Sequence, residues 1–78
     1  MNKYYFSFGQ DHEHKFNGVK LDRDVLLEIE AENSINARKI MFEAFNRKWS
    51  NQFNEDALVE ILDFFPRGII KLKDIITA

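Results

Sequence analysis

Residues 24–32 alternate between two kinds of side chain more regularly than any other part of the chain. The apolar positions are Val25, Leu27, Ile29 and Ala31. The acidic positions are Asp24, Glu28, Glu30 and Glu32. Successive side chains of a strand point to opposite faces, so this alternation predicts an antiparallel strand with one buried face and one face in water. A chain built around such a strand must supply further strands and an apolar cover for the buried face.

Other patterns along the chain predict both the further strands and the apolar cover. Strands are predicted for residues 3–9, 49–53 and 69–73, and Asn17-Gly18 predicts the turn of a small hairpin. An amphipathic helix is predicted for residues 34–47 and a shorter one between Asn54 and Pro66. The order β, β, α, β, α, β predicts an α+β fold: a small antiparallel or mixed sheet with one main helix and one short helix packed on one face. The other face is expected to stay in water unless a partner covers it.

Length and composition predict one domain, residues 1–78. Without cysteine no disulfide can help, so the core must come from the hydrophobic 45% of the chain and its eight Phe, two Tyr and one Trp. The lack of cysteine fits a reducing compartment, and no apolar run approaches the roughly 20 residues of a membrane span. A cytoplasmic protein without a membrane partner is expected. The net charge of −2 argues against a general nucleic-acid binder, so no direct nucleic-acid contact is expected.

The acidic side of residues 24–32 is the predicted partner-binding surface. Its charge comes from Asp24, Glu28, Glu30 and Glu32, with Tyr5 and Leu26 as apolar contacts between them. Carboxylates two residues apart on a strand repeat at about 6.6–6.8 Å, and such a row can attract a basic groove much as nucleic acid does. The alternative is the ordinary polar face of a sheet, with the glutamates paired by Lys71 and Lys73 of a neighbouring strand.

Candidates for catalysis are few. The sequence has no cysteine nucleophile, no Gly-x-Ser-x-Gly elbow and no glycine-rich phosphate loop, which predicts a protein that is not an enzyme and has no cofactor. His12 and His14 are the sole candidate metal ligands of the imidazole type. A site would need further ligands, for which Asp22 and Asp24 qualify only if the loop folds back. The alternative is a solvated polar loop.

A third group of candidate site residues is mainly aromatic. Tyr5 and Trp49 could stack on a nucleotide-like signal molecule whose charge Arg67 would meet. The alternative is that the aromatic residues belong to the core.

The opening Tyr4-Tyr5-Phe6-Ser7-Phe8-Gly9-Gln10, with His12 nearby, resembles that of small uncharacterised proteins from phages and prophages of Gram-positive bacteria. Those proteins often begin with a Tyr-Phe-Thr-Phe-Gly segment. The similarity extends to Glu30-Ala31-Glu32 at a strand end, Ala37-Arg38 at a helix start, and the aromatics Phe45, Trp49 and Phe53. It covers about the first two thirds of the chain, with Ser7 where Thr is usual and Asn46 where Gly is common. The resemblance implies a phage accessory protein in the cytoplasm of the host cell and supplies no catalytic residue.

By analogy with other small phage proteins, the leading hypothesis is a non-enzymatic inhibitor of a host defence component, of the anti-CRISPR type. Its partner would be a host protein or nucleoprotein complex. The alternatives are a sponge for a nucleotide signal and, as a second alternative, a metal-dependent enzyme. An unpaired edge strand would also allow a symmetric homodimer.

Overall fold

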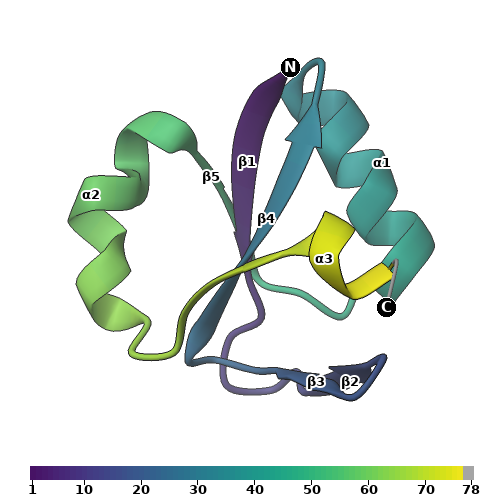
Figure 1. The fold of residues 1–78 in the computed structure, drawn as a ribbon, viewed down its shortest axis with the longest axis vertical. Coiled ribbons are helices and arrows are strands. Elements are labelled where there is room, and N and C mark those ends of the chain that lie inside the picture. Colours follow the sequence, from purple (N-terminus) through teal and green to yellow (C-terminus); the bar gives the residue numbers. More distant parts are fainter. Residues whose placement is uncertain (77–78) are drawn as a thin grey trace.

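The computed structural model describes residues 1–76 of the chain and shows an α+β fold built on a mixed four-stranded sheet (Figure 1). The strands are β1 (Asn2–Ser7), β4 (Val25–Ala31), β5 (Asn51–Asn54) and β6 (Gly68–Lys71), in the order β5-β1-β4-β6. β1 is antiparallel to β4 and β5, whereas β4 and β6 are parallel. β2 (His14–Phe16) and β3 (Val19–Leu21) form a separate hairpin. The predicted fold class is confirmed, and so is the hairpin around Asn17-Gly18.

The helical elements are the main helix α1 (Ser34–Phe45), a covering segment made of η1 (Glu55–Ala57), α2 (Leu58–Ile61) and η2 (Leu62–Phe64), and the short helix α3 (Leu72–Ile76). α1 starts where Asn33 caps it: the Asn33 side chain accepts a hydrogen bond from the backbone N–H of Asn36 at 2.9 Å. Such a bond satisfies one of the free amides of the first turn. The predicted helix 34–47 is therefore right at its start and two residues too long at its end.

The main core lies between the sheet and α1. The register pairs Tyr4 with Ile29 and Phe6 with Leu27, so the apolar members of the alternating pattern share one face. α1 presents Ala37, Met41 and Phe45 to this face at a spacing of four residues. The buried residues of this core are Tyr4, Phe6, Phe8, Leu21, Val25, Leu27, Ile29, Ala31, Ala37, Met41, Phe45, Leu72 and Ile75. Two strands and one helix supply most of this core, and β3 and α3 add Leu21, Leu72 and Ile75.

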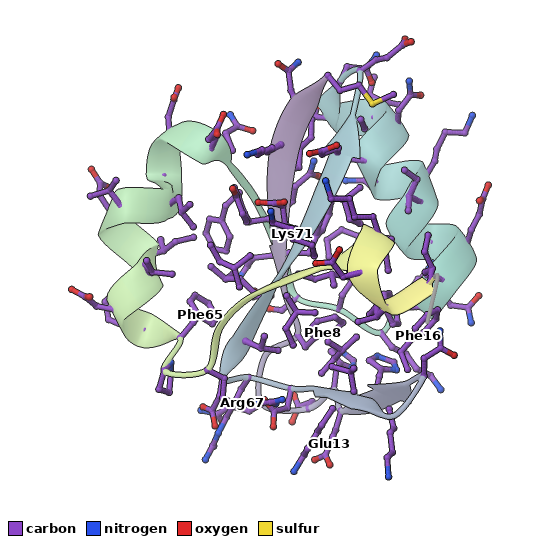
Figure 2. All side chains as sticks on the ribbon, viewed as in Figure 1. Phe8, Glu13, Phe16, Phe65, Arg67 and Lys71 are labelled. Carbon is purple, nitrogen blue, oxygen red and sulfur yellow. The ribbon has the colours of Figure 1, made fainter. Side chains whose placement is uncertain are left out.

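The second face of the sheet is also covered, which contradicts the prediction that both helices pack on one face. Figure 1 shows the covering segment around α2 on one side of β1 and β4, and α1 with α3 on the other. Phe65 lies on the α2 side and Phe16 on the opposite side (Figure 2). Tyr5, Ser7, Leu26 and Glu28, which face the covering segment, are all buried.

Chain topology explains this second layer. β4, β5 and β6 run parallel to one another because β1 is antiparallel to both β4 and β5. The connection from β4 to β5 crosses β1 in one direction, and the connection from β5 to β6 crosses back in the other. Crossovers between parallel strands are right-handed in nearly all proteins, so two crossovers in opposite directions must use opposite faces. The half-buried residues of the second crossover, Ala57, Leu58, Ile61 and Phe65, are apolar and match that position.

The C-terminal elements differ from the prediction in detail. The expected strand 69–73 is β6, which ends at Lys71, and the chain then turns into α3. Leu72 and Ile75 of α3 reach the main core, so the helix closes one end of it. No structure was predicted for residues 74–78, of which 77 and 78 lie outside the described part of the chain.

Candidate functional site

The predicted acidic strand face is not a surface. Glu28 is 5% exposed and accepts a hydrogen bond from the Tyr5 hydroxyl at 2.9 Å. Tyr5 and Leu26 are 2% and 0% exposed, so neither is free to contact a partner. The reason is the covering segment, which lies over this face of the sheet (Figure 1).

The other carboxylates of the predicted face do not form a row either. Asp24 precedes β4 and lies 4.0 Å from the Arg23 guanidinium, while Glu30 pairs with Lys73 at 3.6 Å. Glu32 is exposed beyond the end of β4. The partner-binding surface expected from this strand is therefore wrong: its members are dispersed, turned inward or paired.

The Tyr5–Glu28 pair has the electrostatics of an interior contact. Burial raises the pKa of Tyr5 to about 12, and the hydrogen bond to Glu28, the charge of Glu28 and the charge of Glu55 act in the same direction. A tyrosine so perturbed stays protonated and donates its hydrogen bond through the neutral range. The pair joins β1 to β4 and supports the second face.

The structure does not bring together the three residues proposed for a nucleotide signal. Trp49 packs edge-to-face on Phe6 at 5.2 Å, which places it on the α1 side of the sheet. Tyr5 is buried on the opposite side. Arg67 is held at a third place by Asp22, 3.2 Å away. The nucleotide hypothesis therefore loses its site.

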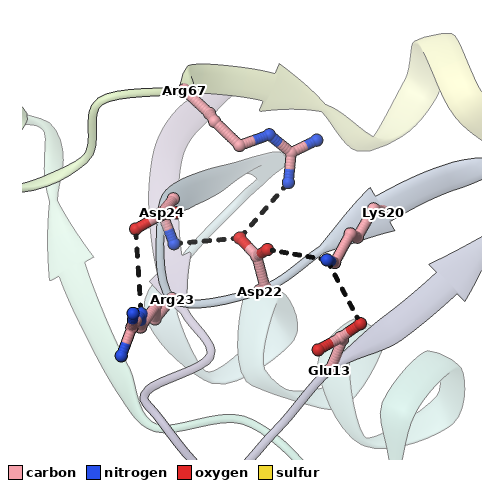
Figure 3. A network of polar contacts seen from close by, with 6 residues as sticks. All are labelled: Glu13, Lys20, Asp22, Arg23, Asp24 and Arg67. Carbon is pink, nitrogen blue, oxygen red and sulfur yellow. Dashed lines mark hydrogen bonds and ion pairs between the residues drawn. The ribbon is translucent and has the colours of Figure 1, made fainter.

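Arg67 belongs to a polar network at the start of β4 (Figure 3). One oxygen of Asp22 accepts hydrogen bonds from the backbone N–H of Asp24 at 3.0 Å and from Arg67, and the other lies 3.8 Å from the Lys20 ammonium. These donors hold the pKa of Asp22 below its usual range, the Asp24 backbone N–H most strongly. Lys20 also pairs with Glu13 at 3.4 Å. The network ties the hairpin to the beginning of β6 and has a structural role.

The two histidines have separate surroundings. His14 Nε2 donates a hydrogen bond to the Lys48 carbonyl at 2.7 Å, and its ring packs against Phe8 and Phe45. His12 lines a polar hollow of about 290 Å³ near Glu13 and Asp22. Within residues 1–76, no group of three or more His, Cys, Asp or Glu side chains is arranged to hold a metal ion. His14 is an anchor between the hairpin and the end of α1.

An exposed acidic surface lies on the covering segment, where the sequence pattern did not predict one. We define the acidic surface as Glu55, Asp56, Glu60 and Asp63 with the apolar residues Val59 and Phe64, all of them exposed. Val59 is 86% and Phe64 75% exposed. No lysine or arginine occurs between residues 49 and 66. In the described part of the chain, none of these four carboxylates has an ion-pair partner.

The sequence contains one indication of this surface. The half-buried apolar stripe of the covering segment consists of Ala57, Leu58, Ile61 and Phe65, so Val59 and Phe64 fall outside it. Large apolar residues that lie outside such a stripe and among carboxylates are candidates for contact with another molecule. Val59 and Phe64 can be recognised as exposed only if this stripe is assigned to the second face of the sheet, and the sequence pattern alone does not make that assignment.

These features define a small α+β protein with helices on both sides of a mixed sheet and an acidic, partly apolar outer layer. Among residues 1–76, no helix combines the length and the apolar character needed to cross a membrane. Comparisons with protein-family models, curated protein sequences and solved structures found no significant match to the chain.

Proposed function

We propose that the protein is a non-enzymatic binding protein whose acidic surface occupies a basic, partly apolar surface on a host protein or nucleoprotein complex. One observation carries the proposal. Val59 and Phe64 are the most exposed large apolar side chains of the covering segment and stand among four carboxylates without ion-pair partners in residues 1–76.

Each component of the surface has a use in binding. An exposed phenylalanine offers apolar area and few rotatable bonds, which are the properties of interface anchors. Carboxylates around it attract a partner of opposite charge and speed its approach. Carboxylates already paired within the protein would contribute less, because their charge is compensated.

The resemblance to phage proteins supports a narrower proposal, inhibition of a host defence component of the anti-CRISPR type. Complexes that hold nucleic acid present a positively charged channel to its backbone. An acidic surface with apolar anchors can compete for such a channel, and salt would weaken the competition. Competition for a basic groove is the mechanism that the sequence predicts for residues 24–32, and it is proposed here for the acidic surface of the covering segment.

Capture from host extract tests the proposal. The test variant is Glu60→Lys with Asp63→Lys, which reverses half of the acidic surface. The matched control is Asp11→Lys with Glu32→Lys, which makes the same change of charge at two exposed residues elsewhere. Both variants are first checked for folding by circular dichroism and thermal melting.

The expected result is a set of proteins from a Gram-positive host that the wild type and the control capture and the test variant does not. Expression of the wild type, but not of the test variant, is expected to raise phage plating on a strain that carries the captured defence system. Identical capture by all three proteins would contradict the proposed surface.

A further inference from the structure

The outer face of α1 has the opposite charge to the covering segment. We define the basic surface as Arg38 and Lys39 with the apolar residues Ile35 and Phe42. Ile35 is 71% and Phe42 42% exposed. Residues 34–48 contain four cations and one carboxylate, Glu43, whereas residues 49–66 contain four carboxylates and no cation. The net charges of the two stretches are therefore +3 and −4.

Two of the four side chains of the basic surface, Arg38 and Phe42, are held by contacts with neighbouring residues. Arg38 Nε donates a hydrogen bond to the Gln52 side chain at 3.0 Å, and Gln52 donates in turn to the Ser34 carbonyl at 3.1 Å. The Arg38 guanidinium lies 6.0 Å from the centre of the Trp49 ring, against which Phe42 packs at 5.8 Å. Side chains fixed before binding lose little conformational entropy when a partner docks.

This face is also hollowed. Ser34, Ile35, Arg38, Lys39 and Phe42 line a shallow hollow of about 320 Å³. A hollow with apolar and cationic walls fits an apolar side chain flanked by carboxylates. The acidic surface presents that combination at Val59 and Phe64.

We propose that the occupant of the basic surface is a second copy of this chain, which docks through its acidic surface. The two surfaces are complementary in charge, and each adds two exposed apolar residues. α1 and the covering segment lie on opposite sides of the sheet (Figure 1), so one molecule cannot join them internally. A stable interface of about 800 Å² per partner would occupy a modest part of the 5210 Å² surface.

The position of the two surfaces determines the kind of assembly. A contact between different surfaces of two copies is heterologous, and each added copy leaves one surface of each kind free. With the surfaces on opposite sides of the sheet, the contact forms open head-to-tail chains. The average mass therefore rises steadily with concentration and falls as salt screens the charges.

This inference goes beyond the proposed function and shares with it only the acidic surface. A basic partner bound at the acidic surface would cap the end of a chain and shorten it. Binding of a partner and self-association are therefore competing uses of one surface, and the basic surface distinguishes them.

Sedimentation equilibrium of the wild type tests the inference. At about 50 mM salt, where screening is weak, the weight-average mass is expected to at least double between about 10 µM and 1 mM protein. At about 500 mM salt the same protein is expected to be monomeric. A monomer under both conditions would overturn the inference, and so would a closed dimer whose mass does not rise further.

Two variants with opposite defects make the test specific. Glu60→Lys with Asp63→Lys brings the acidic surface to zero net charge and leaves the basic surface intact. Ile35→Glu with Lys39→Glu makes the basic surface acidic and leaves the acidic surface intact. The second pair leaves Arg38 and its hydrogen bonds in place. Each variant alone is expected to be monomeric at low salt. An equimolar mixture is expected to associate again, because the intact basic surface of the first variant can bind the intact acidic surface of the second.

The Asp11→Lys, Glu32→Lys protein is the control and is expected to associate like the wild type. Assembly of either surface variant alone, or no assembly of the mixture, would overturn the inference. The variant at Ile35 and Lys39 is expected to retain capture of a host partner, since its acidic surface is intact. Loss of self-association without loss of capture therefore separates this inference from the proposed function.

Discussion

Tyr5 and Glu28 show how one buried contact can reverse the interpretation of a pattern. On the sequence, both lie at positions expected to face water. In the structure, the Tyr5 hydroxyl donates to the Glu28 carboxylate at 2.9 Å, and the two residues are 2% and 5% exposed. A carboxylate in that position needs a donor, because an unpaired buried charge is costly. The alternation correctly predicts which side chains share a face, but it does not reveal whether that face is covered.

Alkaline pH is expected to destabilise the protein through Tyr5. The folded protein holds the Tyr5 proton up to a pKa of about 12, whereas the unfolded chain releases it near 10. The stabilising contribution is therefore complete below pH 10 and is lost as pH rises to 12, by up to about 3 kcal/mol in the free energy of unfolding. Urea denaturation of the wild type and of Tyr5→Phe between pH 8 and 12 measures it.

The phenylalanine variant lacks the group and is the control. At pH 8 it is expected to be less stable than the wild type by about 1–3 kcal/mol, because Glu28 loses its donor. The difference between the two proteins should shrink as pH approaches 12. A difference that stays constant would show that Tyr5 has the same pKa in the folded and unfolded states.

Charge reversal at Glu28 is expected to unfold the protein. A lysine there would be buried beside the Tyr5 hydroxyl, with destabilisation of about 3–5 kcal/mol. Thermal melting of Glu28→Lys measures the effect, with Glu32→Lys as the control at an exposed position. Equal melting temperatures for the two variants would contradict the buried position of Glu28.

At the scale of the elements, the turn after β1 depends on Gly9. Its φ is +71°, and a Cβ there would lie 3.1 Å from the Ser50 Cβ. Ser50 approaches so closely because its backbone N–H donates to the Ser7 carbonyl at 2.7 Å. Gly18 has a similar φ of +85°, but a Cβ there would meet no atom of residues 1–76 within 4 Å beyond its immediate chain neighbours. Substitutions at the two glycines therefore distinguish the cost of backbone strain from the cost of crowding by Ser50.

Alanine at these two positions is expected to differ in cost. Gly18→Ala should lose about 1–2 kcal/mol from the left-handed backbone alone, and Gly9→Ala should lose more because Ser50 must also move. Chemical denaturation of both variants checks the order. Equal losses of stability would show that Ser50 moves away from the added Cβ at no cost in free energy.

The N-terminus of α1 allows a second test of an element. Asn33→Ala removes the acceptor for the Asn36 backbone N–H and is expected to lose about 1 kcal/mol of stability. Asn33→Asp keeps an acceptor and is expected to be near the wild type. An alanine variant as stable as the aspartate variant would show that the cap contributes nothing.

Local patterns predicted the elements better than their arrangement. The spacing of Ala37, Met41 and Phe45 predicts α1, and the turn dipeptide Asn17-Gly18 predicts the hairpin. The side on which the covering segment packs depends instead on strand order and crossover direction, which no single segment encodes. The acidic surface was missed for that reason, because its exposure follows from which side of residues 55–65 meets the sheet.

At the scale of the whole molecule, charge is separated across the sheet. Residues 34–48 on one side carry a net charge of +3 and residues 49–66, mostly on the other, carry −4, although the chain as a whole is at −2. The total therefore conceals two surfaces of opposite sign. Binding through either surface is expected to weaken with added salt, because both contacts depend on exposed charges.

The most direct test of the acidic surface is the affinity of the captured host partner for three proteins measured side by side. The wild type and the Asp11→Lys, Glu32→Lys control are expected to bind with the same dissociation constant within a factor of about three. Glu60→Lys with Asp63→Lys is expected to bind at least about 30-fold more weakly, as loss and reversal of interfacial charges require. Equal affinities for all three proteins would show that the partner docks elsewhere and would contradict the account.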